Sequence, residues 1–185
     1  MELCEVSGTR VDCMLDVEIK TERLSTRPWT AEDWDWYSSA MDDQIRLYTK
    51  EPADLTAAAW LLSSVEAPAD QQTRTAAILD SAGVPIGNVG VRLLDSGRVE
   101  FFYWIESGER GKGFATEILR ALGDWASADL GAAAFELQIH PENQGSIIVA
   151  ERSGYQFDEF RGSAANCADE LGRVAIYERY ADSGA

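Results

Sequence analysis

Alternating and helical patterns of hydrophobic residues divide most of the chain into strands and helices. Short runs rich in β-branched and aromatic residues predict strands over 17–27, 74–80, 85–94, 98–105, 132–139, 155–160 and 171–180. Apolar residues three and four positions apart predict helices over 30–41, 54–65, 113–128 and 144–153. This order of elements predicts an α/β or α+β fold, in which one mixed sheet is flanked by helices on both faces.

The helix over 113–128 has the clearest pattern. Its apolar stripe consists of Ile118, Leu119, Leu122, Trp125 and Ala126, which lie on one helix face. In the helix over 30–41, Thr30 followed by Asp33 is typical of a helix start. The segment 42–52 is expected to be irregular, and the apolar residues 147–149 are expected to reach the core.

The length and the absence of repeats indicate one domain. A chain of 185 residues can bury a substantial core. Residues 1–16 show no clear period, so we expect them to form an N-terminal arm or an added edge, and residues 17–182 to form the domain.

A glycine-rich loop between a strand and a helix carries the strongest chemical signal. The strand sequence Glu100-Phe-Phe-Tyr-Trp-Ile105 runs into Glu109-Arg-Gly-Lys-Gly-Phe-Ala-Thr-Glu117. Free backbone N–H groups at a helix N-terminus attract anions, glycines allow close approach, and Arg110 and Lys112 add positive charge. The loop therefore predicts a pyrophosphate site; the alternative is a glycine-rich turn with incidental charge.

Three phosphate-loop patterns compete for this segment. The P-loop pattern fails because Gly113 follows Lys112 where Ser or Thr is required, and the dinucleotide pattern fails because Thr116 replaces its third glycine. The pattern [Arg/Gln]-x-x-Gly-x-[Gly/Ala] is met by Arg110, Gly113 and Ala115. In this loop the chain resembles the GNAT acetyltransferase superfamily, which binds the pyrophosphate of acetyl-CoA there.

Two more segments resemble the RimJ/RimL-type branch of this superfamily, which acetylates N-terminal amines of ribosomal proteins. They are residues 21–33, and His140-Pro-Glu-Asn-Gln-Gly-Ser146 followed by Ala150-Glu-Arg-Ser-Gly-Tyr155. The resemblance covers about residues 17–180. It implies a GNAT-type fold, acetyl-CoA as the acyl donor, no metal, and direct attack by a primary amine in a ternary complex. The cofactor contacts that it implies are Trp104, Ile105, Arg110, Gly111, Lys112, Gly113, Phe114, Ala115, Thr116 and Asn143.

Glu100 is the candidate general base. It alternates with Phe102 and Trp104 on one face of its strand, and a carboxylate among aromatic residues is costly unless the site uses or pairs it. The resemblance implies that it acts as a base or holds a water molecule. The alternative is a structural pairing with Arg98 or a neighbouring strand.

Ser146 is the candidate general acid. The resemblance implies that its hydroxyl acts near the departing thiolate, and Ala150 stands where many GNAT enzymes carry a tyrosine acid. A serine in the first helical turn can also cap the helix. Asn143 is the better cap, and it also matches the family asparagine that binds the pantetheine arm.

The candidate acceptor contacts are aromatic residues and the single histidine, namely Trp34, Tyr37, Tyr48, Phe102 and His140. Phe102 stands where RimJ/RimL-type sequences usually carry glycine, so it would narrow the acyl or acceptor pocket. The alternative for the tryptophans and tyrosines is a role in the core. For His140 the alternatives are general-base catalysis and a structural position.

The charge and the cysteines of the chain limit the class of partner and the cellular location that we expect. A formal net charge of −16 argues against nucleic acid and fits a cationic acceptor drawn in by the field, although solubility alone also explains it. No apolar run is long enough to span a membrane, and the N-terminus lacks a signal-peptide pattern. Cys4, Cys13 and Cys167 are odd in number and lack metal-binding spacing, which fits reduced thiols and a cytoplasmic location.

Several functional alternatives stay open at this stage. The acceptor could be a small cationic amine such as an antibiotic or a polyamine, or the protein could be a non-catalytic acyl-CoA-binding or sensing module. A larger acyl group such as succinyl would need a cation near the thioester, for which Arg92 and Arg98 are the candidates. A homodimer through the late strands is also open.

Overall fold

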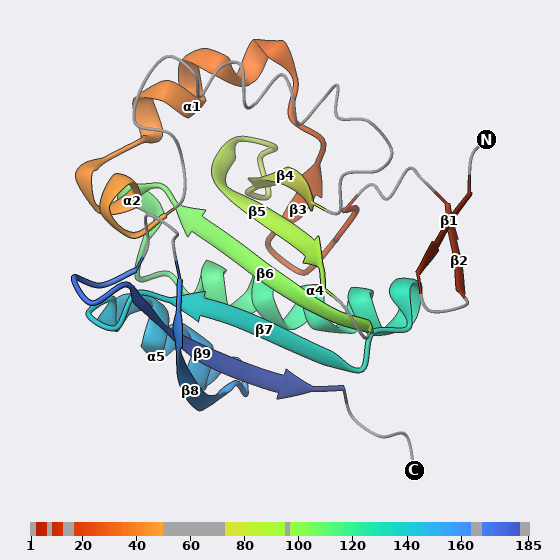
Figure 1. Ribbon diagram of the computed structural model, residues 1–185. Helices are drawn as coiled ribbons and strands as arrows, with labels where there is room; N and C mark the ends of the chain where they lie inside the picture. The colour runs from red at the N-terminus through yellow and green to blue at the C-terminus, as the bar shows by residue number, and fades with distance from the viewer. Residues whose placement is uncertain are drawn as a thin grey trace.

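A mixed β-sheet forms the centre of the protein in the computed structural model, which describes residues 3–6, 9–12, 17–49, 73–94, 97–163 and 168–181 (Figure 1). Its strand order is β3-β4-β5-β6-β7-β9-β8, and only the β6–β7 pair is parallel. The strands are β3 (Ser25–Arg27), β4 (Thr73–Leu79), β5 (Pro85–Leu93), β6 (Arg98–Ile105), β7 (Ala134–Ile139), β8 (Gln156–Gly162) and β9 (Arg173–Tyr180). The expected mixed sheet is therefore confirmed.

Helices cover both faces of this sheet, as predicted. The helices are α1 (Trp34–Ala40), α2 (Asp43–Tyr48), α4 (Phe114–Leu130) and α5 (Gln144–Arg152), with 3₁₀ turns η1 (Ala31–Asp33) and η3 (Ser107–Glu109). In Figure 1, α4 and α5 lie behind the sheet, whereas α1 and α2 lie at its other side. The helix α4 makes the crossover that joins the parallel strands β6 and β7, as a parallel connection requires.

Two apolar clusters follow from this layering. The larger one joins α4, through Ile118, Leu119 and Leu122, to the sheet face that carries Phe101 and Phe135. The smaller one lies at α1 and is largely aromatic: Trp29, Tyr37 and Trp104 pack edge to face, with ring centroids 5.2 and 5.3 Å apart. In β6, Val99, Phe101 and Ile105 thus enter the larger cluster, whereas Trp104 enters the smaller one, which agrees with the predicted alternation.

The parallel strands β6 and β7 pair over only part of their length. Their register runs from Arg98↔Ala134 to Glu100↔Glu136, although β6 continues to Ile105 and β7 to Ile139. Figure 1 shows the two arrowheads well separated at their carboxyl ends. The sheet is therefore open beyond Glu100, because the facing edges of the two strands no longer hydrogen-bond to each other.

The expected strand over 17–27 is wrong for most of its length. Only Ser25–Arg27 form a strand, and Lys20 makes an isolated bridge to Ser25. The chain turns back at Thr21, whose N–H donates to the Leu24 carbonyl at 2.8 Å and whose hydroxyl accepts from the Leu24 N–H at 2.9 Å. A threonine side chain in a turn competes with an extended ladder in this way, and the hydrophobic pattern does not report it.

The expectation of an irregular segment over 42–52 is also wrong, because it contains α2. The Asp42 carboxylate accepts the Ile45 N–H at 2.8 Å and so caps this helix. Six residues are too few to display a helical period. Within 147–149, Ile147 and Val149 pack on the core as expected, but Ile148 is 45% exposed.

The bounds of the other expected elements agree with the structure to within about two residues. These are the remaining strands and the helices over 30–41, 113–128 and 144–153. The first turn of the helix over 30–41 is a 3₁₀ turn. Residues 3–6 and 9–12 form β1 (Leu3–Val6) and β2 (Thr9–Asp12), which pair with each other in a sheet of their own. The helix expected over 54–65 lies outside the described residues, as do Cys13 and Cys167.

Gly87 in β5 provides a test of this packing. An added Cβ at Gly87 would lie 2.3 Å from the Trp104 carbonyl oxygen of β6, whereas one at Gly162 in β8 would meet nothing within 4 Å. We expect Gly87→Ala to lower the free energy of unfolding by about 1–3 kcal/mol, because the backbone of β6 must shift. Denaturant unfolding measures this loss. Gly162→Ala is the control, and an equal effect of both variants would contradict the packing described.

Candidate active site

A cleft of about 630 Å³ lies where β6 and β7 separate. Its walls come from the C-terminal half of β6, the end of β7, the helix α2, the start of α4 and the first turns of α5. The predicted site residues that line it are Glu100, Phe102, Trp104, Ile105, Arg110, Gly111, Gly113, Phe114, Ala115, Thr116, His140, Asn143, Ser146 and Tyr48. The fold thus gathers residues that are up to about a hundred positions apart in the sequence.

The glycine loop forms one end of this cleft. Gly111 and Gly113 have positive φ angles of 78° and 85°, which L-residues with a side chain adopt only under strain. Gly113 is the N-cap of α4 and, among the described residues, no side chain caps that helix start. The N–H groups of residues 114–116 are therefore left for a ligand. An uncapped helix start behind two glycines fits a pyrophosphate group, as the sequence predicts.

The two cations of the loop are already paired inside the protein. Arg110 donates to the Ile105 carbonyl at 2.8 Å and to the Gln44 side chain at 2.7 Å, and its guanidinium lies 2.7 Å from the Asp42 carboxylate. Lys112 bonds to Glu109 at 2.8 Å and, unlike Arg110, does not line the cleft. Arg110 therefore ties the loop to α2, and both cations of the loop have partners within the protein.

A second tether joins the loop to the segment before β3. Arg23 donates to the Lys112 carbonyl at 3.1 Å and pairs with Glu117 in the first turn of α4 at 2.5 Å. Thr21 adds a hydrogen bond of 2.5 Å to the same carboxylate, and these hydrogen bonds lower the pKa of Glu117 against the effect of its burial. The motif over 21–33 thus has a structural role in holding the glycine loop.

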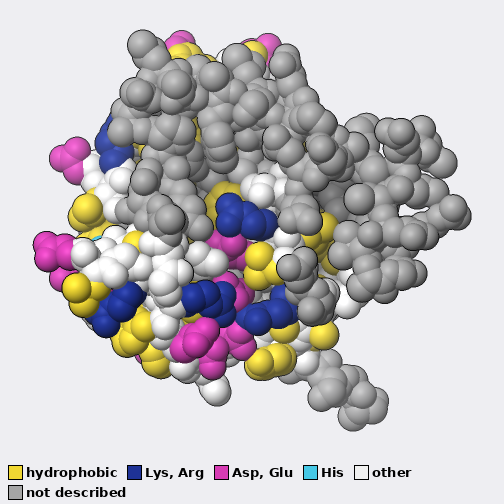
Figure 2. All heavy atoms as spheres, in the orientation of Figure 1, with side chains coloured by type: hydrophobic (Ala, Val, Ile, Leu, Met, Phe, Trp, Pro, Cys, Tyr) yellow, Lys and Arg dark blue, Asp and Glu magenta, His cyan; other side chains and the backbone are white. Residues whose placement is uncertain are grey.

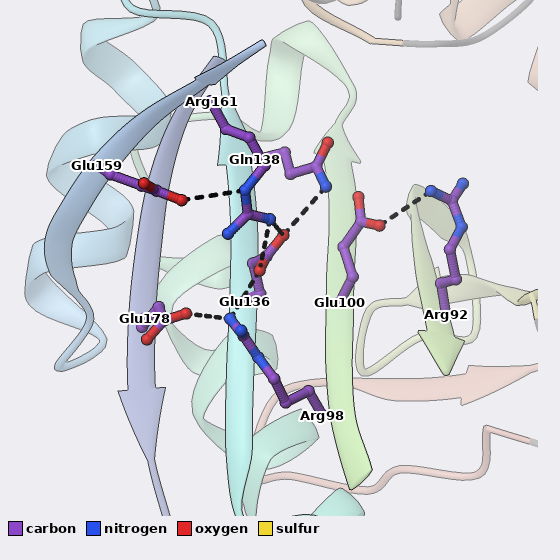
Figure 3. Close-up of polar contacts among 8 residues, drawn as sticks. All are labelled: Arg92, Arg98, Glu100, Glu136, Gln138, Glu159, Arg161 and Glu178. Atoms are coloured by element: carbon purple, nitrogen blue, oxygen red, sulfur yellow. Dashed lines mark hydrogen bonds and ion pairs between the residues drawn. The ribbon is translucent and has the colours of Figure 1, made fainter. Parts of the chain in front are cut away.

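Glu100 points to the same side of the sheet as Phe102 and Trp104 and is only 2% exposed. Its carboxylate pairs with Arg92, which lies directly opposite on β5, at 2.9 Å (Figure 3). The alternative of a structural partner on a neighbouring strand is therefore realised by Arg92 and not by Arg98. Glu100 still lines the cleft, so structural pairing and contact with a ligand are compatible.

Arg92 and Glu100 belong to a polar row that crosses the sheet. Glu100 lies opposite Glu136 of β7, and Glu136 lies opposite Glu178 of β9. Arg98 bonds to Glu136 at 2.8 Å and also to Glu178, as Figure 3 shows. In Figure 2, blue and magenta side chains alternate on this face, beside the grey region.

Glu136 is the best-enclosed member of the row. It is fully buried and also accepts hydrogen bonds from Arg161 of β8 at 3.0 Å and from Gln138 at 3.0 Å. Every face of its carboxylate therefore meets a donor, which is what a buried charge requires. The row links β6, β7, β8 and β9 at the point where the cleft begins.

On the other wall, Asn143 and Ser146 occupy the first turn of α5. The Asn143 side chain accepts the Ser146 N–H at 3.1 Å, so the cap role expected for Asn143 is confirmed. The Tyr103 hydroxyl is buried opposite Ser146, and burial raises the pKa of Tyr103 to about 12 although the nearby Ser146 hydroxyl opposes this rise. The two hydroxyls do not meet in hydrogen-bond geometry, so we treat them as neighbours.

The structure divides the candidate acceptor contacts. Tyr48 and His140 pack ring to ring, with centroids 5.2 Å apart, at the α2 side of the cleft. The Phe102 ring covers Gly90 on β5, where an added Cβ would lie 2.0 Å from it. Tyr37 is completely buried in the smaller cluster, and Trp34 packs against that cluster. Neither lines the cleft, so the alternative of a core role describes these two residues.

Sequence reasoning missed several residues that line the cleft, including Tyr103, Gln44 and Gln138. Strand alternation places Tyr103 on the face opposite Glu100, and nothing in the pattern indicates that the cleft reaches this face where β6 leaves β7. Gln44 lies on α2, which was not expected. A second, more open hollow of about 870 Å³ lies between α4, α5 and β8–β9, but it contains none of the residues proposed for catalysis or CoA binding.

Within the described residues there is no cluster of three or more His, Cys, Asp or Glu side chains that could hold a metal ion. In the same part of the chain, no helix combines the length and apolar character that a membrane crossing requires.

Comparison with known proteins gives a consistent family. Residues 23–156 match the model of the acetyltransferase (GNAT) domain. The chain is 27% identical over 143 residues to the uncharacterized N-acetyltransferase p20 of Bacillus licheniformis. The aligned residues make up 74% of this chain and 80% of that protein.

Solved structures share the fold at low sequence identity. One is the acetyltransferase of Salmonella typhimurium that modifies the N-terminal serine of the 50S ribosomal subunit protein L7/L12, with a TM-score of 0.75 and 14% identity over 88% of this chain and 97% of that one. Another is RimJ of Mycobacterium smegmatis in complex with CoA-disulfide, with a TM-score of 0.72 and 17% identity. The match covers 86% of this chain and 82% of that one. The family model covers most of the chain and agrees with the fold and the glycine loop, so the chain belongs to the GNAT acetyltransferase family.

Proposed function

We propose that the protein transfers the acetyl group of acetyl-CoA to a primary amine, and that the N-terminal amine of a protein or peptide is the preferred acceptor. The observation that carries this proposal is the composition of one cleft. Its loop end offers uncapped backbone N–H groups, and its walls bring Glu100 and Ser146 to the same space. The fold shared with enzymes that modify ribosomal proteins supports the choice of acceptor.

The loop end would hold the pyrophosphate of acetyl-CoA. The backbone N–H groups of residues 114–116 would bind it, with Gly111 and Gly113 allowing close approach. The pantetheine arm would then lie between β6 and β7, where the facing edge of β6 is unpaired beyond Glu100. Acetyl-CoA, when bound, supplies an activated thioester.

Glu100 would remove the proton that an amine carries at neutral pH. Its carboxylate pairs with Arg92 at 2.9 Å and lines the cleft, where an amine could reach it. An amine freed of its proton can attack the acetyl carbon, which forms a C–N bond and breaks the C–S bond. The Ser146 hydroxyl, in the first turn of α5, would donate to the departing sulfur.

The acidic character of the chain and the aromatic wall suit a cationic acceptor. The formal net charge of −16 attracts a protonated amine over distance. Phe102, Tyr48 and His140 would bound the acceptor space on the side of the sheet that carries Glu100. A succinyl donor is less favoured, because Arg98 is engaged with Glu136 and Glu178 and only Arg92 of the two candidate cations lines the cleft. A cytoplasmic location and a homodimer stay predictions.

The test of the proposed function is acetyl-CoA-dependent thiol release with three kinds of acceptor: peptides with free N-termini, polyamines and aminoglycosides. We expect release with the peptides and a matching mass gain on their N-termini. Glu100→Gln and Ser146→Ala should lower kcat by about a hundredfold each, because each removes one proton-transfer group. Glu142→Gln, in the turn before α5, is the control for charge alone.

Two results would contradict this assignment. Release confined to polyamines or aminoglycosides would replace the peptide acceptor by a small amine. CoA binding in calorimetry without release from any amine would favour an acyl-CoA-binding or sensing module.

The glycine loop can be tested by binding alone. Gly113 and Gly131 flank α4 at its two ends, both with positive φ. Valine at either position strains the backbone, but only Gly113→Val disturbs the proposed pyrophosphate contacts. We expect Gly113→Val to weaken CoA binding by at least about tenfold, or roughly 1.4 kcal/mol, and Gly131→Val to leave it unchanged. Unchanged affinity in a folded Gly113→Val protein would rule out the loop.

Phe102 can be tested as a boundary of the acceptor space. Because it shares a face with Glu100, its ring should limit the size of the first residue of a peptide acceptor. We expect Phe102→Ala to raise kcat/KM for peptides that begin with leucine, relative to those that begin with alanine, by about tenfold or more. Phe102→Leu keeps most of the volume and serves as the control. A ratio that stays constant in both variants would place the acceptor elsewhere.

A further inference from the structure

A buried hydroxyl in the cleft wall is left without a partner. The hydroxyl of Tyr103 in β6 is enclosed and, among the described residues, has no hydrogen-bond partner. Tyr103 nevertheless lines the cleft together with Ser146. Leaving a buried donor unsatisfied costs free energy, so such a group in a native protein calls for an explanation.

Ser146 lines the same cleft and carries a hydroxyl that could satisfy this donor. Its hydroxyl is close enough to oppose the rise that burial imposes on the pKa of Tyr103. Its backbone N–H is already taken by Asn143, which fixes the turn of α5 that carries it. With that turn fixed, a hydrogen bond between the two residues would require the Ser146 side chain to turn about its Cα–Cβ bond.

The donor and acceptor roles in such a hydrogen bond decide where the hydrogen of Ser146 points. A serine hydroxyl carries one hydrogen and can accept two hydrogen bonds. Burial disfavours the phenolate, so Tyr103 keeps its proton at neutral pH and can donate that hydrogen to Ser146. If Ser146 accepts from Tyr103, its own hydrogen must point elsewhere, and the open side is the cleft.

We propose that Tyr103 is a positioning residue, which donates a hydrogen bond to Ser146 Oγ and thereby directs the Ser146 hydrogen toward the sulfur of CoA. No proton leaves Tyr103 in this arrangement, because a phenolate buried beside the core would be costly. The inference rests on the proposed function, since it requires the CoA sulfur to reach Ser146.

Tyr155 provides a matched control. Its hydroxyl is also buried and without a partner among the described residues, and burial raises its pKa as well. Tyr155 belongs to the main core and does not line the cleft. Tyr155 senses the charge of Tyr103, but Tyr155→Phe removes a buried hydroxyl without changing the cleft wall.

The experiment uses CoA and desulfo-CoA as probes and needs no acceptor. Calorimetry between about pH 7 and 9, where a thiol titrates, gives the ratio of the two affinities. In the unmodified protein we expect this ratio to rise several-fold with pH, because a directed hydroxyl stabilises the thiolate. Tyr103→Phe and Ser146→Ala should each flatten the rise, the double variant should add nothing further, and Tyr155→Phe should behave like the unmodified protein.

Turnover gives a second readout once a peptide acceptor is identified. Tyr103→Phe should lower kcat by about tenfold, because a misdirected acid retains part of its effect, and should leave KM for acetyl-CoA unchanged. In the Ser146→Ala protein the same substitution should have no further effect. A purely structural role would instead change thermal stability and KM together.

The outcomes separate the inference from the function on which it rests. If Tyr103→Phe keeps the pH-dependent ratio while Ser146→Ala loses it, or if the two effects add, Tyr103 does not position Ser146. If the unmodified protein binds CoA without any dependence of the ratio on pH, Ser146 does not act at the sulfur, and the inference fails while CoA binding stands. Absence of CoA binding altogether would instead refute the proposed function.

Discussion

The cleft depends on how two carboxylates are held side by side in the sheet. Glu100 and Glu136 occupy directly opposite positions on β6 and β7, in the last pair before the strands separate. Like charges at such positions repel each other. Each is therefore matched by arginine: Arg92 pairs with Glu100 from one side, and Arg98 and Arg161 pair with Glu136 from the other. The Arg98–Glu136 pair fastens β6 to β7 where their pairing ends, and the other two pairs tie these strands to β5 and β8.

The two carboxylates differ in their access to the cleft. Removing one partner of a buried ion pair typically costs about 3–5 kcal/mol, because the remaining charge is left uncompensated. The arginines here keep about a third of their side-chain surface exposed, which lessens that cost, but Glu136 itself is enclosed. Glu136 is thus committed to holding β6, β7 and β8 together. Glu100 pairs with Arg92 and also lines the cleft, so of the two carboxylates it is the one that a ligand in the cleft can meet.

The glycine loop shows a similar division between holding and binding. Its cations tie it to α2 through Asp42 and to η3 through Glu109, while Arg23 and Glu117 tie it to the segment before β3. The backbone N–H groups at the start of α4 have no capping side chain among the described residues. A loop anchored in this way can hold its positive-φ glycines in place without a ligand, and this preorganisation reduces the entropy lost on binding.

The sequence by itself determined the elements whose pattern is long and regular, and the chemistry of the loop. Strand alternation in β6, the stripe on α4 and the two glycines before it are local properties, so they could be read directly. Only the tertiary structure decided that Arg92 and not Arg98 pairs with Glu100, that Tyr37 is core, and that Tyr103 reaches the cleft. These depend on strand register and on the separation of β6 from β7, which arise from contacts between residues far apart in the chain. The turn at Thr21 and the short α2 escaped prediction because side-chain hydrogen bonds, and not hydrophobic periodicity, define them.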